Sequence, residues 1–327
     1  MINKEVTLGI DLGGTNTKIG LVNKLGYCLS ELSIPTGAKE PFSKFLDNIH
    51  HAVEKLKDEL NHEVTIRSVG IGAPNGNYYT GLIEEAPNLH WGDRVPIVKE
   101  VGSRLSLPVT LTNDANAAAL GELLFGVAQG MKNFIVITLG TGLGSGIVVN
   151  GELVYGHDGF AGELGHTTIF ADEGRDLATG RKGSLEAYVS ATGIKRTVFE
   201  LLAKRIYPSE LRDISFNNLE AKHITEAAKR GDKIALEAFD YTAKLLGFKL
   251  SDTIAHLSPE AIILFGGLAH AGDLLLVPTK KYMNHYCLNI FRNKVELLFS
   301  NLKGNNTAIL GASALAWIEL DKKNSPN

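Results

Sequence analysis

The sequence predicts an α/β protein with two lobes around a shared cleft, and three observations lead to this prediction. The chain has 327 residues, which exceeds the size at which a single hydrophobic core keeps growing. Apolar stretches of strand length alternate with stretches of helical periodicity. A pattern of strand, glycine turn and strand occurs twice, as IDLGGTNTKIGLV and as ITLGTGLGSGIVV. We interpret this repeat as a duplication in which each lobe contributes one such element to the cleft.

The first half opens with three predicted strands, which turns join into an antiparallel meander. Apolar residues at helical spacing then predict an amphipathic helix that covers the sheet. Two further short strands enclose a segment with a helical pattern. In order, these elements are Val6–Asp11, Lys18–Val22, Tyr27–Ser33, a helix with apolar positions from Phe42 to Leu60, Ile66–Ile71, the helical Val95–Leu105, and Val109–Thr112.

The second half repeats this opening and then becomes mostly helical from Tyr188 to about His256. One further strand precedes a pair of glycines, and two helical segments follow. The predicted elements are Phe134–Leu139, Ser145–Val149, an Asn150-Gly151 hairpin into Leu153-Val154, Ala261–Phe265, and helices near 271–286 and 306–320. We expect the small lobe to comprise residues 1–112 with 307–327, and the large lobe to comprise residues 113–306.

The composition favours a small-molecule partner. Lys plus Arg number 33 and Asp plus Glu number 36, a balance that gives no basic surface for nucleic acid or an anionic membrane. The cysteines are Cys28 and Cys287, without a CxxC pair or a disulfide framework, which suits a reducing compartment. No export signal precedes the first strand, and no apolar run approaches the roughly 20 residues of a membrane span. We therefore expect a cytoplasmic protein.

Glycine turns at the ends of three predicted strands indicate phosphate binding. Without Cβ atoms, the backbone N–H groups of Gly13-Gly14 can approach a phosphate closely, and Thr15 and Thr17 offer hydroxyl donors. The turn leads into a strand, so it matches neither the Walker pattern nor the dinucleotide pattern. Gly140–Gly144 forms the second turn and Gly266-Gly267 the third. The alternatives are an ordinary glycine hairpin for the first turn and a strand terminator for the third.

An Asn-Asp pair marks the predicted boundary between the lobes. Asn113 and Asp114 lie between the strand that ends at Thr112 and a helix that an alanine-rich run propagates. Asp114 could simply cap that helix. Beside two phosphate-binding turns, however, the pair also offers an amide and a carboxylate to a hydroxylated substrate.

Five segments together resemble one family. They are GIDLGGTNTKIG, NDANAAALGE, TLGTGLGSGIVVNGEL, GFAGELGH and GSLEAYVS. In this order they are similar to the ROK family of sugar kinases and repressors, and most to its bacterial glucokinases. The resemblance spans nearly the whole chain. It implies an actin-like, hexokinase-like ATPase fold whose two lobes close over ATP and a sugar.

The resemblance also implies roles for particular residues. Asp114 becomes the catalytic base that activates the sugar hydroxyl, and Asp11 helps to hold Mg²⁺ through water. The implied sugar contacts are Asn113, Asp114, Glu163, His166 and Glu186, with Asn88 as a neighbour. The implied nucleotide contacts are Asp11, Gly13, Gly14, Thr15, Thr17, Lys18, Gly140, Thr141, Gly142, Gly266 and Gly267. For Glu163 and Glu186 a surface or salt-bridged carboxylate is the alternative, and for His166 a core residue.

The chain departs from the family pattern at a structural zinc site. Most members bind zinc through the histidine of GELGH and three cysteines of a C-x-C-G-x-x-G-C stretch, whereas the matching positions here are Leu177, Thr179 and Ser184. One imidazole cannot supply the four ligands of tetrahedral zinc. We therefore predict no zinc, His166 as a sugar contact only, and a loop from Ile169 to Lys182 held by packing and hydrogen bonds.

The implied reaction is transfer of the γ-phosphoryl group of ATP to the 6-hydroxyl of a hexose. Glucose is the first choice, while N-acetylmannosamine, N-acetylglucosamine and fructose stay open because one lining residue can decide which sugar fits. The family also contains repressors, but their helix-turn-helix domain is not expected ahead of a first glycine turn so close to Met1. A non-catalytic sugar-binding regulator is the other alternative. The resemblance suggests a homodimer.

Overall fold

Two five-stranded sheets organise the chain in the computed structural model, which describes residues 4–60, 63–177, 179–302 and 306–324. The first sheet has the order β3-β2-β1-β4-β7 and the second the order β10-β9-β8-β11-β12. The strands of the first are β1 (Glu5–Leu12), β2 (Asn16–Asn23), β3 (Cys28–Pro35), β4 (Thr65–Gly72) and β7 (Val109–Thr112). Those of the second are β8 (Phe134–Leu139), β9 (Leu143–Val149), β10 (Glu152–Leu153), β11 (Ala261–Phe265) and β12 (Glu296–Phe299).

The two sheets have the same topology. In each, three consecutive strands form an antiparallel meander, and two later strands join it in parallel on the side of the first strand. The glycine turns connect equivalent strands, β1 to β2 and β8 to β9. The predicted α/β fold is confirmed, and the shared topology supports the predicted duplication. The strands β12 and the short pair β5 (Ile83–Glu84) and β6 (Arg94–Val95) were not predicted.

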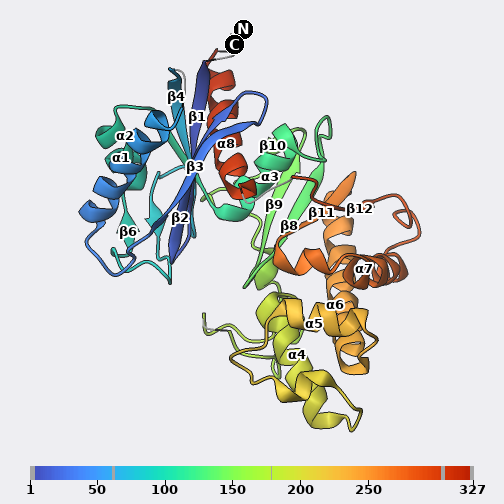
Figure 1. Cartoon of the computed structure of the whole chain (residues 1–327). Helices are drawn as coiled ribbons and strands as arrows, with labels where there is room; N and C mark the ends of the chain where they lie inside the picture. Colours follow the sequence, from blue (N-terminus) through green and yellow to red (C-terminus); the bar gives the residue numbers. More distant parts are fainter. Residues whose placement is uncertain (1–3, 61–62, 178, 303–305, 325–327) are drawn as a thin grey trace.

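Eight α-helices lie in the part of the chain that the structure describes, and most surround the outer faces of the sheets (Figure 1). Helices α1 and α2 pack on the first sheet, and α4 to α7 gather beside the second. The helices are α1 (Phe42–Asp58), α2 (Ile97–Leu105), α3 (Asp114–Phe125), α4 (Ala191–Lys204), α5 (Ala221–Lys229), α6 (Lys233–Leu257), α7 (Asp273–Tyr286) and α8 (Thr307–Asn324). The predicted helices are therefore present, with α1 ending two residues before Leu60.

Helices α3 and α8 lie between the sheets and pack against each other (Figure 1). Each follows the last strand of one sheet but packs on the other: α3 contacts β8 and β9, whereas α8 contacts β1 and β4. The exchange explains why residues after 306 belong spatially with the first sheet. The division of the chain into lobes at residues 112 and 306 agrees with this packing and stays a prediction.

Glycines allow these helices to approach the sheets closely. A Cβ at Gly70 of β4 would collide with the carbonyl oxygen of Ala312 in α8, and one at Gly9 of β1 with that of Ile309. Where the helices cross, a Cβ at Gly121 would come 3.1 Å from the Cα of Gly311. Because backbone atoms cannot move aside as side chains can, glycine is required at these contacts. The close packing fixes α3, and therefore its N-terminus, relative to both sheets.

Candidate active site

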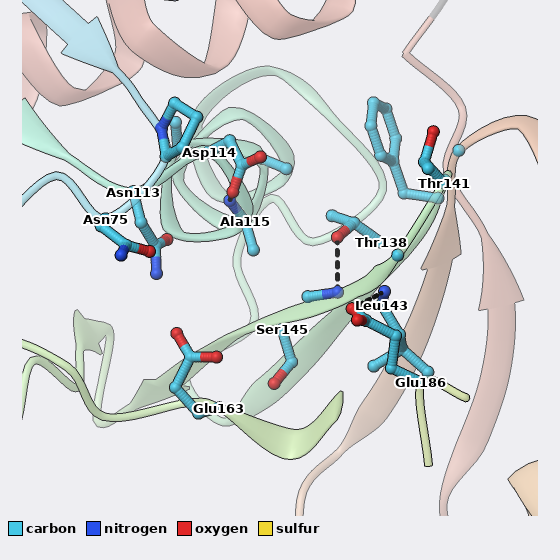
Figure 2. A pocket seen from close by; sticks show the side chains of 18 of the residues that line it. Asn75, Asn113, Asp114, Ala115, Thr138, Thr141, Leu143, Ser145, Glu163 and Glu186 are labelled. Atoms are coloured by element: carbon cyan, nitrogen blue, oxygen red, sulfur yellow. Dashed lines mark hydrogen bonds between the residues drawn. The ribbon is translucent and has the colours of Figure 1, made fainter. Parts of the chain in front are cut away.

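A cleft of about 680 Å³ opens where the end of β1, the second glycine turn, the start of α3 and the segment before α4 converge. Its lining includes seven predicted site residues that carry a carboxylate, amide or imidazole side chain. They are Asp11, Asn88, Asn113, Asp114, Glu163, His166 and Glu186. Figure 2 shows Asn113 and Asp114 on one side of this cleft and Glu163 facing them from the other. Residues that are 175 positions apart in sequence therefore line one cavity.

At the start of α3, one residue caps the helix and the next one places a carboxylate in the cleft. Asn113 is the N-cap residue, and its side-chain oxygen accepts a hydrogen bond of 2.7 Å from the backbone N–H of Asn116. Asp114 is the first helical residue, and one of its carboxylate oxygens accepts from the N–H of Ala115 at 2.8 Å. The alternative in which Asp114 caps the helix is therefore wrong, because Asn113 performs that function. Asn113 keeps its amide N–H groups available for a ligand.

Acidic side chains crowd the cleft, and burial raises the pKa values of several of them. Desolvation raises the pKa of Asp11 to about 6, and the neighbouring charge of Asp114 adds to the increase while Lys18 opposes it. Desolvation also raises the pKa of Asp114, although its backbone hydrogen bonds partly counteract this. The Asp114 side chain is open to the cleft but enclosed by protein on its other sides, so it is both accessible and poorly solvated. Carboxylates in such surroundings are strong proton acceptors or cation ligands.

Glu163 and His166 form a second pair across the cleft. Glu163 precedes a short 3₁₀ segment, Leu164–His166, that ends at His166, and the Nε2 atom of His166 lies 3.7 Å from a carboxylate oxygen of Glu163. Desolvation raises the pKa of Glu163; His166 opposes the increase, whereas Asp114 and Glu186 reinforce it. The His166 side chain is 35% exposed, so the core-residue alternative for it is wrong. Its ring can exchange hydrogen bonds with a hydroxylated ligand.

Glu186 connects the segment of Glu163 and His166 to the second glycine turn. One of its carboxylate oxygens accepts a hydrogen bond of 2.8 Å from the backbone N–H of Leu143 (Figure 2). Its own N–H donates to the carbonyl of Gly165 at 2.9 Å, next to His166. The side chain is therefore neither a free surface carboxylate nor part of a salt bridge in the described residues.

The second turn is held from several directions. The N–H of Gly140 donates to the carbonyl of Gly142. From the first turn of α4, the N–H of Ala191 donates to the carbonyl of Gly140, and the hydroxyl of Thr192 donates to the carbonyl of Thr141. Gly140, Thr141 and Gly142 line the cleft, as predicted for residues that contact a phosphate. A Cβ at Gly142 would collide with the Glu186 carboxylate, so a larger residue there would have to displace that side chain.

The first turn lies beside the cleft and is supported by buried hydroxyls. Thr17 is fully buried, and its hydroxyl lies 2.9 Å from that of Thr36, which donates to the carbonyl of Gly13 at 2.7 Å. This corrects the prediction that Thr17 offers a donor to phosphate: alternation along β2 turns its side chain into the core. Thr15 is exposed at the turn, and Gly14 packs against Asn88.

The other predicted nucleotide contacts are Lys18, Gly266 and Gly267, which lie in or near the cleft. Lys18 is opposite Asp11 in the β1–β2 ladder, and its charge is felt by that carboxylate. Gly266 has φ of 100° and lines the cleft, and with Gly267 it also borders an adjoining cavity of about 320 Å³. The third turn therefore borders two neighbouring cavities, and its contact with the nucleotide stays a prediction.

Several residues that line the cleft were not predicted. Thr138 accepts a hydrogen bond of 3.1 Å from the N–H of Gly144, and Ser145 donates to the carbonyl of Gly162. Asn75 lines the cleft near Asn113 with φ of 51°, its amide donating to the carbonyl of Glu85. Thr138 and Ser145 flank the glycine turn in the sequence and could have been inferred from it. Asn75 carried no such signal, because a loop brings it to the cleft.

The zinc positions of the family pattern do not form a metal site. The side chain of Leu177 packs against the apolar core, and Ser184 is fully buried beneath the loop. Thr179 is exposed. Among the described residues no group of three or more His, Cys, Asp or Glu side chains could hold a metal ion. The donor set therefore does not fit zinc, and the absence of zinc stays a prediction.

Comparison with known proteins agrees with this arrangement. The ROK family profile matches residues 7–318. The chain belongs to the ROK family. The glucokinase of Halalkalibacterium halodurans is 35% identical over 321 residues, which cover 97% of this chain and 96% of that protein. The N-acetyl-D-glucosamine kinase of Mannheimia succiniciproducens is 31% identical over 94% of this chain and 98% of that protein.

A solved ROK structure has the same fold. The ROK family glucokinase from Streptomyces griseus, in complex with glucose and AMPPNP, superposes with a TM-score of 0.80 and 33% sequence identity, covering 96% of this chain and 99% of that one. The predicted hexokinase-like architecture of the ROK fold is thereby confirmed. No helix in the described part of the chain is long and apolar enough to cross a bilayer.

Proposed function

We propose that this ROK protein transfers the γ-phosphoryl group of ATP to the 6-hydroxyl of a hexose, with glucose as the preferred substrate. The glucokinases among its relatives support the choice of sugar and nucleotide. The observation that carries the proposal is the placement of Asp114 at the N-terminus of α3, open to the same cleft that the Gly140–Gly142 turn lines. A carboxylate and a glycine turn thus line one cavity.

In the proposed mechanism Asp114 accepts the proton of the sugar hydroxyl as its oxygen attacks the γ-phosphorus. The loose transition state of phosphoryl transfer demands positioning and charge neutralisation more than a strong base. The raised pKa of Asp114 nevertheless makes it a better acceptor than an ordinary carboxylate. Since Asn113 has its oxygen engaged in the cap, its amide is oriented to donate to a neighbouring sugar hydroxyl.

Glu163, His166 and Glu186 are proposed to bind the remaining hydroxyls, with Asn88 at the edge. A pyranose presents hydroxyls around its ring, and carboxylates with an imidazole on the facing wall can accept from or donate to them. Glu163 and His166 are held 3.7 Å apart, so they can bind two adjacent hydroxyls. This wall is the part of the cleft that would select between glucose and an N-acetylated hexose.

The phosphates of ATP are assigned to the two glycine turns, with Gly13, Gly14 and Thr15 on one side and Gly140, Thr141 and Gly142 on the other. Gly266 and Gly267 are assigned to the rest of the nucleotide. Asp11 and its neighbour Asp114 repel each other, and a cation close to Asp11 would relieve this repulsion. Asp11 is therefore a fitting water-mediated ligand for Mg²⁺, which usually binds through one or two carboxylates and substrate phosphates. When bound, Mg²⁺ neutralises charge on the phosphate oxygens.

The remaining proposals concern the cell and the assembly. A kinase that produces hexose 6-phosphate from ATP would act in the cytoplasm, at the entry of sugars into glycolysis. The resemblance to the family suggests a homodimer, which sedimentation of the purified protein would test.

The experiment that tests the function is a coupled ADP-release assay with glucose, N-acetylglucosamine, N-acetylmannosamine and fructose, each with and without Mg²⁺. We expect glucose to give the highest kcat/KM. Asp114→Asn preserves the size of the side chain and removes the proton acceptor, so kcat should fall by about 10²- to 10⁴-fold. If no hexose is turned over while glucose still binds, the alternative of a non-catalytic regulator replaces the kinase. A near-normal kcat in Asp114→Asn with an intact fold would reject the base.

A further inference from the structure

Arg175 is a buried arginine in an otherwise solvent-exposed loop. Its side chain is only 7% exposed, whereas Asp172, Glu173 and Asp176 around it are exposed. The loop joins the segment that carries Glu163 and His166 to the segment that carries Glu186. A buried guanidinium is costly unless it is paired and hydrogen-bonded, so its partners identify what it fixes.

All five N–H groups of the Arg175 guanidinium are used. Nε and one Nη2 hydrogen donate to the two carboxylate oxygens of Glu200, both at 2.8 Å. The other Nη2 hydrogen donates to the hydroxyl of Thr197 at 2.9 Å. Nη1 donates to the carbonyls of Ala187 and Gly193, at 3.2 and 3.0 Å. The guanidinium carbon also lies 4.4 Å from the centre of the Tyr188 ring.

The backbone of Arg175 extends the same network. Its N–H donates to the hydroxyl of Tyr188 at 2.9 Å, and its carbonyl accepts from the N–H of Gly183 at 3.0 Å. Arg175 therefore joins its own loop, the segment Ala187-Tyr188 and the first three turns of α4 into one unit. Lysine could not replace it, because three donors on a point charge do not reproduce five donors in a planar fork.

Two parts of this unit are linked directly to residues that line the cleft. Glu186 immediately precedes Ala187 and accepts from the N–H of Leu143 in the second glycine turn. The start of α4 holds the same turn through Ala191 and Thr192, which bond to Gly140 and Thr141. The hydrogen bonds of the Arg175 guanidinium thus fix the Glu186 carboxylate and the second glycine turn relative to each other.

We propose that Arg175 is a positioning residue for phosphoryl transfer, which acts through Glu186 and the Gly140–Leu143 turn. The proposal rests on the proposed function, since it assumes that Glu186 contacts the sugar and the turn contacts the phosphates. In the loop residues that the structure describes, the positions of the family's zinc cysteines offer no metal ligand. The Arg175 network is the cross-link that this chain's own residues provide there.

The first test compares Arg175→Lys with Arg175→Met and with Arg181→Lys as the matched control. Arg181 lies in the same loop, is exposed and makes a single bond to the hydroxyl of Thr168. Because small displacements of reacting groups have large kinetic effects, Arg175→Lys should lower kcat/KM for the sugar by about 10- to 100-fold. Arg181→Lys should leave it within about two-fold. Should Arg175→Met unfold at the assay temperature, Arg175→Lys alone decides.

The second test separates positioning from general support of the fold. In a double-mutant cycle with Glu186→Gln, a residue that acts through Glu186 loses most of its effect once Glu186 is altered. We therefore expect Arg175→Lys to lower kcat/KM much less in the Glu186→Gln background than in the wild type. An effect of equal size in both backgrounds, or no effect of Arg175→Lys in the wild type, overturns the proposal.

The third test does not depend on turnover. Loss of the fork should loosen Glu186 and speed hydrogen exchange of the Leu143 amide by about ten-fold or more, while Arg181→Lys leaves that exchange rate unchanged. Unchanged exchange at Leu143 in Arg175→Lys would overturn the positioning role. A wild-type protein that phosphorylates no hexose would reject the proposed function, and the exchange measurement would still decide the role of Arg175.

Discussion

The raised pKa of Asp11 predicts that replacing this carboxylate stabilises the protein at neutral pH. In the folded protein the pKa rises from the ordinary value of 3.8 to about 6, mainly through desolvation and then through the charge of Asp114. Below pH 3.8 the group is neutral in both states and contributes nothing. As pH rises, the unfolded chain ionises first, so folding is disfavoured progressively and the full cost is present above pH 6.

The size of this effect follows from the two pKa values. The difference between 3.8 and about 6 corresponds to roughly 3 kcal/mol. Because the carboxylate is in contact with cleft water, we reduce this to about 1–2 kcal/mol. Asp11→Asn should therefore raise the free energy of unfolding by about 1–2 kcal/mol near pH 7.5, and the gain should shrink as pH falls through 6.

Urea unfolding of the nucleotide-free protein, followed by tryptophan fluorescence across this pH range, measures the effect. Asp172→Asn is the control, because Asp172 is exposed on a loop away from the cleft. Kinase activity of Asp11→Asn should fall at the same time, since the proposed Mg²⁺ ligand is lost. If Asp11→Asn is no more stable than the wild type near pH 7.5, the desolvation and repulsion assigned to Asp11 are wrong.

Three further predictions follow from the site and the packing. The kcat/KM of the wild type should decline as pH is lowered through about 6, because Asp11 takes up a proton there and the pKa of Asp114 is also raised; a flat pH–rate profile down to pH 5 would contradict this. Thr36→Val breaks the hydrogen bonds that run from Thr17 through Thr36 to Gly13. It should raise the KM for ATP in steady-state kinetics and lower the free energy of unfolding by about 1–3 kcal/mol. An unchanged KM would show that these hydrogen bonds do not support nucleotide binding. Gly70→Val forces a side chain into the backbone of α8 and should cost about 3 kcal/mol or more of unfolding free energy. The control Gly102→Ala, whose Cβ meets only ordinary contacts in α2, should be neutral or stabilising by up to about 1 kcal/mol.

Local patterns in the sequence were sufficient for most elements of the fold. Periodicity located β1 to β4, β8 to β11 and the long helices, because burial of one face imposes a repeat on the chain. The four-residue strand β12 was missed, since its apolar run, ELLF, is too short to show a period and becomes a strand only by pairing with β11. The exchange of α3 and α8 between the sheets also left no local trace, because it depends on contacts between distant segments.

For the candidate site, too, the sequence predicted the surroundings of some residues correctly and those of others wrongly. The resemblance to the family pointed to Asp114, Glu163, His166 and Glu186, and all four line the cleft. Thr17 was assigned to the cleft by its neighbourhood in the motif, but the pleat of β2 turns it inward. Which residue caps α3 was likewise open, and the backbone geometry assigned the cap to Asn113.

The sequence by itself determined the fold class, the duplicated glycine turns and the chemical groups available to a cleft. Those properties depend on residues close together in the chain, whose spacing records which face is buried and where the backbone turns. Only the tertiary structure decided that Arg175 joins its loop to α4, that Asn75 lines the cleft and that Asp114 lies near enough to Asp11 to raise the pKa of Asp11. Contacts of this kind arise from the packing of remote segments, and single positions in a sequence do not encode them.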